Sequence, residues 1–148
     1  MNQLVKKAAI VMACVFGLGI SNSYATTNDN GEVKDAFRHD FGNGKLMSTE
    51  DHDNYSKVVF NMNGQVMTAF YSTTGNLLAV TRNLVTSQLP MNLLLNFKNH
   101  YNGYWVSDLF ELSKDAESNY YLTLENGDKK VTLRSNGDSW EVYSSAKK

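Results

Sequence analysis

Apolar residues recur at helical spacing in two stretches of the chain. Over residues 32–41 they stand at i, i+3, i+4 and i+8, which places them in one stripe along a helix. A second stretch opens at Pro90, and proline is tolerated in a first helical turn. The stripe residues are Val33, Ala36, Phe37 and Phe41, then Leu89, Leu93, Leu94, Phe97 and Tyr101. We therefore predict two amphipathic helices, the first capped by Asn30 and the second ended by Asn102-Gly103.

Outside these helices, apolar and polar residues alternate with a period of two, which predicts β-strands. Asn-Gly pairs such as Asn63-Gly64 separate several of these runs, and such pairs favour tight hairpin turns in which both central residues have positive φ. The predicted strands span residues 55–62, 65–72, 77–85, 104–112, 120–125, 129–135 and 139–144. The pattern is that of an α+β domain, with two helices on one face of a largely antiparallel sheet of about seven strands.

The order of elements repeats along the chain. A helix followed by strands occurs over residues 32–86 and again over residues 87–145. Residues 60–65 align with residues 123–128, and each segment contains an Asn-Gly pair. A repeat of this kind indicates two similar units, although hairpin proteins also share such spacing without common origin. Duplication is therefore a hypothesis at this stage.

Alternation also divides the side chains between the two faces of the sheet. If Asn126-Gly127 is a two-residue turn, Leu122 pairs with Val131, and Tyr120 pairs with Leu133, on the core side. The opposite side then carries Tyr121, Thr123, Glu125, Lys130, Thr132 and Arg134. In the first hairpin the corresponding side carries Val59, Asn61, Val66, Thr68 and Phe70. This side of the first hairpin is more apolar than a solvent-exposed face requires, so we expect that another segment covers it or that a partner binds there.

The N-terminus has the three parts of an export signal. Lys6 and Lys7 supply positive charge, residues 8–20 are an apolar run, and Ser23-Tyr24-Ala25 is a small-x-small cleavage pattern. A membrane-spanning helix needs ~20 apolar residues, and this run has thirteen. We expect residues 1–25 to be a signal peptide, 26–31 a flexible leader and 32–148 a single domain. The alternative is a lipoprotein cleaved before Cys14, since the residues that precede it loosely resemble a lipobox.

Cleavage after Ala25 changes the composition. The remaining 123 residues contain no cysteine, so their stability comes from a packed core rather than from disulfides. They contain twelve basic and fifteen acidic residues, a net charge of −3, with no basic stripe of the kind that nucleic acid requires. We expect a periplasmic or secreted protein without a membrane span and without nucleic acid as a partner.

Candidate metal ligands are few. His39, His52 and His100 have no second ligand at metal-binding spacing. The acidic segment 50–54 resembles a calcium loop, but Tyr55 and Ser56 stand where such a loop needs a carboxylate or amide and then glycine. A solvated loop is the simpler interpretation. We also find no nucleophile elbow, P-loop or dinucleotide fingerprint, so we predict no catalytic residue, metal or cofactor.

Several segments together match the pattern of a known family: Ala36-Phe37 with Phe41, residues 60–64 continuing to 69–71, residues 75–79, Leu89-Pro90, residues 101–106 and residues 120–124. With these segments the chain resembles the PepSY-like exported bacterial proteins, which have a beta-lactamase-inhibitor-like fold. The resemblance covers nearly all of residues 26–148. It implies two helix-plus-strand units side by side, with an open concave sheet face that in the inhibitor grips a protein. That inhibitor relies on disulfides, which residues 26–148 lack, so the functional analogy is weaker than the analogy of fold.

From these observations we expect a non-catalytic binding module that engages a protein or peptide through its open sheet face. Aromatic side chains inside a polar rim would supply the contact. The residues expected on that face are Val59, Phe70, Tyr121, Thr123 and Thr132, with Phe70 and Tyr121 exposed. One alternative is a small-ligand carrier, which requires an apolar pocket of ~300 Å³ or more. The other is a small hydrolase, which requires a nucleophile within hydrogen-bond reach of a base.

Overall fold

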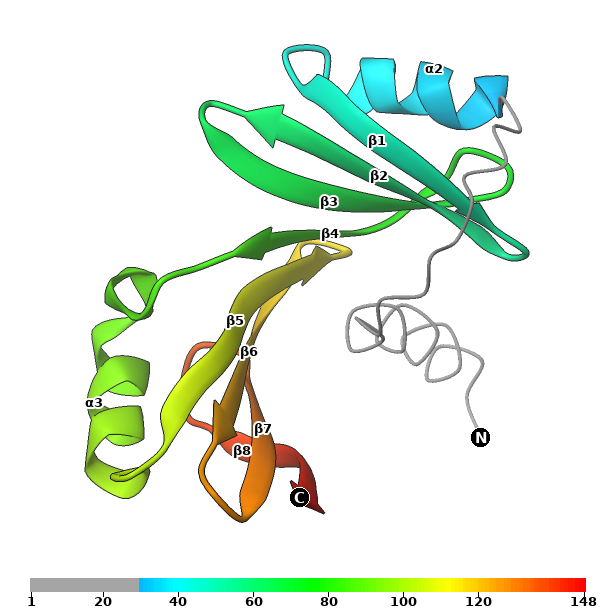
Figure 1. Cartoon of the computed structure of the whole chain (residues 1–148). Helices are drawn as coiled ribbons and strands as arrows, with labels where there is room; N and C mark the ends of the chain where they lie inside the picture. The colour runs from blue at the N-terminus through cyan, green and yellow to red at the C-terminus, as the bar shows by residue number, and fades with distance from the viewer. Residues whose placement is uncertain (1–29) are drawn as a thin grey trace. The chain divides into compact units, whose positions relative to one another are not determined.

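A computed structural model describes residues 30–148 (Figure 1). The expected signal peptide, Cys14 and residues 26–29 lie outside the described residues. The strands follow one another in chain order across an eight-stranded antiparallel sheet. The elements are α2 (Gly31–Asp40), β1 (Lys45–His52), β2 (Tyr55–Met62), β3 (Gln65–Ser72), β4 (Leu77–Asn83), the short helix η1 (Thr86–Gln88), α3 (Met91–His100), β5 (Trp105–Lys114), β6 (Glu117–Glu125), β7 (Lys129–Ser135) and β8 (Glu141–Lys147).

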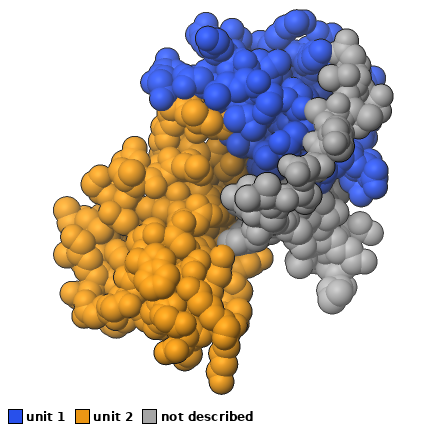
Figure 2. Space-filling view, in the orientation of Figure 1, with its two compact units in different colours: residues 1–64, 68–79 blue, residues 65–67, 80–148 orange. Residues whose placement is uncertain are grey.

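The chain divides into two compact units (Figure 2). Unit 1 contains the described residues up to Gly64 together with Thr68–Ala79, and unit 2 contains Gln65–Met67 and Val80–Lys148. Each unit holds one of the two helices and the strands against which that helix packs. The predicted α+β class is therefore confirmed, while duplication stays a hypothesis.

In unit 1, aromatic rings join α2 to the sheet. The ring of Phe37 on α2 meets that of Phe60 on β2 edge-on, with centroids 5.1 Å apart, and the ring of Phe41 lies 4.7 Å from the same Phe60. Phe60 is fully buried. At the start of the helix, the Val33 N–H donates to Oδ1 of Asn30 at 3.4 Å, which confirms the predicted cap. The apolar stripe of the first helix thus packs as its spacing indicated.

The turn between β3 and β4 requires glycine for two reasons. Gly75 has a φ of +76°, which L side chains rarely adopt. It also lies against α2, because a Cβ at this position would stand 3.1 Å from the carbonyl oxygen of Glu32. This turn therefore also positions the helix.

In unit 2, leucines fill the space between α3 and the strands. The core cluster is Leu84, Leu89, Leu109, Leu122, Leu124, Val131 and Leu133. Each fully buried leucine contributes about 1.5–3 kcal/mol relative to an exposed one. Trp140, which precedes β8, donates from its Nε1 to the carbonyl oxygen of Leu93 at 2.9 Å. The connection from β7 to β8 is thereby attached to the helix.

Strand β1 is absent from the predicted elements. The sequence pattern predicts no strand over these residues, and it favours the interpretation of residues 50–54 as a solvated loop. That interpretation is wrong for Glu50, Asp51 and His52, which belong to β1, while Asp53 and Asn54 form the turn to β2. The cause is physical: β1 lies at the sheet edge, and seven of its eight residues are exposed, so the strand shows no apolar alternation. In residues 30–148, no group of three or more His, Cys, Asp or Glu could hold a metal ion.

The hairpin at Asn126-Gly127 also differs from the prediction. Leu122 pairs with Leu133 and Leu124 with Val131, a shift of two residues from the expected register. Oδ1 of Asn126 accepts hydrogen bonds from the N–H groups of Asp128 and Lys129, at 2.9 and 2.8 Å, so Gly127 and Asp128 become the central residues of the turn. Because the shift is even, every side chain stays on its predicted face. At Asn63-Gly64, in contrast, both residues have positive φ, as predicted.

The turn between β5 and β6 contains a residue type that does not suit its backbone. Asp115 and Ala116 have φ of +50° and +65°, and alanine in this left-handed region costs roughly 1–2 kcal/mol.

We predict that Ala116→Gly raises the free energy of unfolding by about 0.5–1 kcal/mol, since glycine adopts this φ freely but loses more entropy on folding. Urea denaturation checks the value. The matched control is Ala36→Gly within α2, which should lower stability by about 1 kcal/mol; a loss of stability in both variants would contradict the explanation.

Candidate functional site

The sheet of unit 2 has one face covered by α3 and one turned away from it, which we call the distal face. Cross-strand pairing assigns its residues. One row of partners is Phe110, Tyr121, Arg134 and Glu141, from β5 to β8. We call this the aromatic row. A second row, the threonine row, is Asp108, Thr123, Thr132 and Ser144.

The aromatic row is tightly connected. The rings of Phe110 and Tyr121 stack with centroids 5.1 Å apart, and the ring of Tyr143 meets Tyr121 edge-on at 5.7 Å. Burial raises the pKa of the Tyr121 phenol, while a hydrogen bond from Arg134 opposes this effect. Arg134 places its Nε and its Nη2 each 2.7 Å from Oε1 of Glu141. The row therefore ends in a charge-assisted pair in which one carboxylate oxygen receives both contacts.

The threonine row lies beside the aromatic row. The hydroxyl oxygens of Thr123 and Thr132 are 3.3 Å apart and hydrogen bonded. Next to them, burial raises the pKa of the Asp108 carboxyl, while the Leu109 N–H and the charge of Lys130 oppose the rise. A carboxylate held in a partly desolvated position is a frequent feature of functional sites, although ion-pair networks produce it too.

Exposed aromatic and charged side chains surround these rows. Trp105 and Tyr143 are 53% and 43% exposed. The ammonium of Lys148 lies 4.7 Å from the Trp105 ring centroid and 2.7 Å from Oε2 of Glu125. Hydrogen bonds from Lys148 and Ser107 lower the pKa of the Glu125 carboxyl. The distal face thus combines a packed centre with exposed aromatic residues and a charged edge.

Unit 1 has a smaller group of stacked rings on the face opposite α2, which we call the ring group of unit 1. The ring of His52 stacks on Tyr55 at 4.4 Å, and Tyr55 lies 6.2 Å from Phe70. Lys57, a neighbour of these rings on β2, forms an ion pair with Glu50 at 3.2 Å. Rings from β1, β2 and β3 therefore follow one another across this face too.

The five residues predicted for binding lie on the predicted faces, away from the helices, but they are less accessible than expected. Phe70, Tyr121, Thr123 and Thr132 are only 2–5% exposed, and Val59 is half-buried. The expectation that Phe70 and Tyr121 are exposed is therefore wrong. Part of the reason is packing between neighbouring strands, since each ring lies against other rings and the two threonines bond to each other.

The exposed residues of the distal face escaped the sequence prediction. Trp105 lies beyond a bulge of β5 between Val106 and Asp108, so alternation along the strand does not assign its face. Tyr143 lies at a similar irregularity of β8, between Val142 and Ser144. A bulge reverses the parity of alternation, so counting residues assigns the wrong face beyond it. Arg134, in contrast, was already placed opposite the core by its register.

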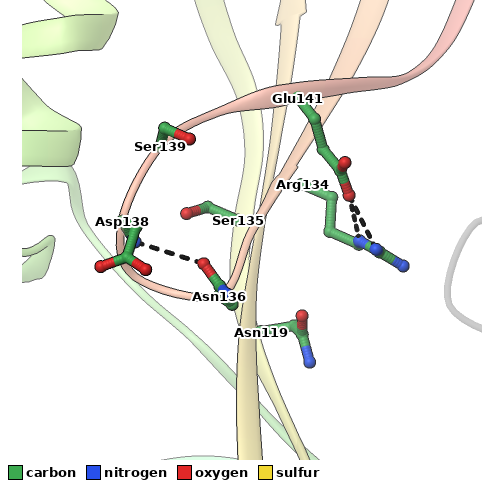
Figure 3. Close-up of a pocket in the computed structure, with 7 residues that line it drawn as sticks. All are labelled: Asn119, Arg134, Ser135, Asn136, Asp138, Ser139 and Glu141. Atoms are coloured by element: carbon green, nitrogen blue, oxygen red, sulfur yellow. Dashed lines mark hydrogen bonds and ion pairs between the residues drawn. The ribbon is translucent and has the colours of Figure 1, made fainter.

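A polar pocket of about 310 Å³ adjoins the end of the aromatic row (Figure 3). Arg134 and Glu141 belong to both the row and the pocket. The pocket is lined by Asn119, Arg134, Ser135, Asn136, Asp138, Ser139 and Glu141. Its lining is polar, so it is not the apolar cavity that a small-ligand carrier would need.

The histidines have local partners. His39 Nδ1 lies 2.9 Å from Asp40, His100 Nδ1 lies 2.9 Å from the carbonyl oxygen of Asn96, and His52 stacks on Tyr55. These contacts are typical of surface and helix-end histidines. They give no support to the hydrolase alternative, which requires a nucleophile beside a base.

Comparison with known proteins yields similarity of structure alone. Neither a family model nor a curated protein matches the chain. A BLIP-like protein from Bacteroides fragilis superposes with a TM-score of 0.67 at 22% identity, covering 79% of this chain and 84% of that one. The chain has the BLIP-like fold. This confirms the beta-lactamase-inhibitor-like fold, whereas PepSY-like membership stays a hypothesis.

Two further neighbours agree with this fold. A DUF2874 family protein from Bacteroides ovatus has a TM-score of 0.68 at 14% identity, covering 84% of this chain and 89% of its own. A protein from Bacteroides eggerthii, described provisionally as periplasmic, has a TM-score of 0.67 at 12% identity, covering 84% and 90%. In residues 30–148, no helix has the length and apolarity to cross a membrane. At such low sequence identity, these similarities establish the fold and say nothing of the activity.

The raised pKa of Asp108 leads to a stability prediction. In the folded state Asp108 keeps its proton to a higher pH than in the unfolded chain, where the carboxyl has its ordinary pKa of 3.8. The free energy of unfolding therefore falls as the pH rises from 3.8 through the raised pKa of the folded state. We predict that Asp108→Asn stabilises the protein at pH 7, and that this gain disappears below pH 3.8, where Asp108 is neutral. Urea denaturation at several pH values measures both effects.

The exposed Asp128 of the β6–β7 turn provides the control. Asp128→Asn removes the same charge from an exposed position, so it should give no comparable gain in stability at pH 7. A gain for Asp108→Asn that is the same at pH 3 and pH 7 would show that charge burial is not its cause.

Proposed function

We propose that the protein is an exported, non-catalytic binding module that engages a protein or peptide through the distal face. One observation carries the proposal: the aromatic row, with Tyr143 and Trp105 exposed beside it and the Arg134–Glu141 pair at its end. Aromatic residues and arginine are enriched at the centres of protein interfaces, and charged residues at the rim. The similarity to a BLIP-like protein adds support at the level of fold.

In this proposal the exposed and buried residues have different tasks. Tyr143 and Trp105 bury their rings against the partner, and the Lys130–Glu125 ion pair contributes to the polar rim. Tyr121, Thr123 and Thr132 form the rigid layer beneath, held by ring packing and by the hydroxyl pair. Binding to a surface that is already ordered loses less conformational entropy. In unit 1 we propose a separate, smaller contact through the half-buried Val59, with the buried Phe70 in the layer beneath it.

Site-specific photocrosslinking tests the proposed face. Benzoylphenylalanine placed at position 143 of the full chain, expressed in cells that export it, should form a discrete adduct with one partner. The same residue at position 91 is the control, since Met91 is 67% exposed on α3. We expect the adduct from position 143 alone. Identical adducts from both positions, or adducts from neither, would refute binding through the distal face.

A substitution pair distinguishes interface residues from structural ones. Tyr143→Ala should weaken binding of the crosslinked partner about 10- to 100-fold, as expected for an aromatic anchor worth ~1.4–2.8 kcal/mol. Met91→Ala should leave the affinity unchanged. Because both residues are exposed, both variants should fold, which circular dichroism verifies. Equal affinities for the two variants would remove Tyr143 from the interface.

Export makes an independent prediction. Cleavage after Ala25 yields a periplasmic or secreted chain that begins at Thr26, whereas the lipoprotein alternative yields a membrane-bound chain that begins at a lipidated Cys14. Intact mass spectrometry of the fractionated cell distinguishes the two. Ala25→Arg should block processing and Cys14→Ser should leave it unchanged. Loss of processing in Cys14→Ser, with normal processing of Ala25→Arg, would establish the lipoprotein instead.

A further inference from the structure

The pocket beside the aromatic row is lined by residues of strands and by residues of one loop (Figure 3). Arg134 on β7 and Asn119 on β6 contribute from regular strands, and Glu141 begins β8. Asp138 and Ser139 belong to the loop between β7 and β8. Since Arg134 and Glu141 also end the aromatic row, a segment lying along that row would reach the pocket.

The loop side of the pocket is held in place by hydrogen bonds to α3. Nδ2 of Asn92 donates to the carbonyl oxygens of Gly137 and Asp138, at 2.8 and 2.7 Å. Trp140 bonds to the carbonyl oxygen of Leu93 at the other end of the loop. The Gly137 N–H donates to Oγ of the buried Ser135 at 3.0 Å. The bonds at Gly137 and Asp138 use backbone groups of the loop, and the Trp140 bond uses its indole N–H, so none of them occupies the Asp138 carboxylate.

The charges of the pocket are unbalanced. Arg134 directs its Nε and Nη2 to Oε1 of Glu141, and it also bonds Tyr121. Within residues 30–148, the Asp138 carboxylate has neither an ion pair nor a hydrogen bond to a donor. The arginine and Glu141 neutralise each other, which leaves the pocket with one net negative charge. The second oxygen of Glu141 and the side chains of Asn119 and Ser139 add further acceptors.

This arrangement selects the charge of an occupant. A lysine ammonium carries three donors and an arginine guanidinium five, and neither has an acceptor, so both match a pocket rich in acceptors. A carboxylate would meet Asp138 and Glu141 while the arginine is already occupied. An acidic net charge of the exported chain would also favour approach of a basic segment.

We propose that this pocket receives a lysine or arginine side chain of the segment that binds the distal face. The inference deepens the proposed function and rests on it for the source of the side chain. The pocket's preference for a cation can be measured without any partner. The partner thus carries a basic side chain next to the apolar residues that cover Tyr143.

The test uses a small probe and the whole protein. Nα-acetyl-lysine methylamide is titrated into ¹⁵N-labelled protein, with Nα-acetyl-norleucine methylamide as the uncharged probe of similar length. We expect saturable amide shifts at Asn119 and residues 134–141, with a dissociation constant of about 1–10 mM. The norleucine probe should cause no shifts there. Equal shifts with both probes, or none with lysine, would overturn the proposal.

Two variants locate the charge that is responsible. Asp138→Asn should weaken lysine binding about fivefold, which is the upper range for a single exposed ion pair. Asp128→Asn removes an equal charge from the β6–β7 turn and should leave binding unchanged. Asp138 is exposed and Asn92 bonds its backbone, so the variant should fold. Equal weakening of lysine binding in both variants would show that the net charge of the protein causes the effect. That result would contradict binding of lysine in the pocket.

The two proposals fail in different ways. Lysine binding at the pocket without an adduct at position 143 would support the cation preference and refute docking on the distal face. An adduct without lysine binding would support docking and overturn the pocket.

Discussion

Each unit of this protein has one helix for two sheet faces, and this imbalance shapes the rest of the structure. A helix can bury only one face of the strands against which it packs, so the other face must be stabilised by its own side chains or by a partner. In unit 1 the helix side is filled by Phe37, Phe41 and Phe60, and in unit 2 by a leucine cluster. The faces turned away from the helices carry rows of rings, paired threonines and ion pairs instead.

The composition of the distal face follows from this constraint. Cross-strand neighbours are the unit of sheet stabilisation, and aromatic pairs and opposite charges each contribute roughly 0.2–1 kcal/mol. Phe110 with Tyr121, Thr123 with Thr132, and Arg134 with Glu141 are three such pairs on adjacent strands. The same pairs connect β5, β6, β7 and β8, so they stabilise the sheet on the face that α3 does not cover. In the proposed function this ordered surface would lose less conformational entropy on binding.

The loop between β7 and β8 links this face to the helix on the other side of the sheet. Asn92 and Trp140 connect α3 to the loop through bonds to backbone carbonyls. The helix therefore does more than bury leucines, since it also positions the pocket residues that precede β8. A substitution on α3 can alter the pocket without touching any residue of the distal face, and interface mutagenesis has to take this coupling into account.

The sequence by itself determined the two helices with their stripes, the Asn30 cap, seven of the eight strands and the faces of the two hairpins at Asn63-Gly64 and Asn126-Gly127, because periodicity is a local property of the chain. Even the misplaced register after Asn126 left the faces intact, since the shift was two residues. Only the tertiary structure decided three things. It identified β1 as an edge strand, which its polar residues could not reveal. It placed Trp105 and Tyr143, because bulges reverse the parity that counting relies on. It placed Asp138 in the same pocket as Arg134 and Glu141, because Asn92, on a helix distant in sequence, bonds the backbone of the loop, and no local pattern encodes that bond.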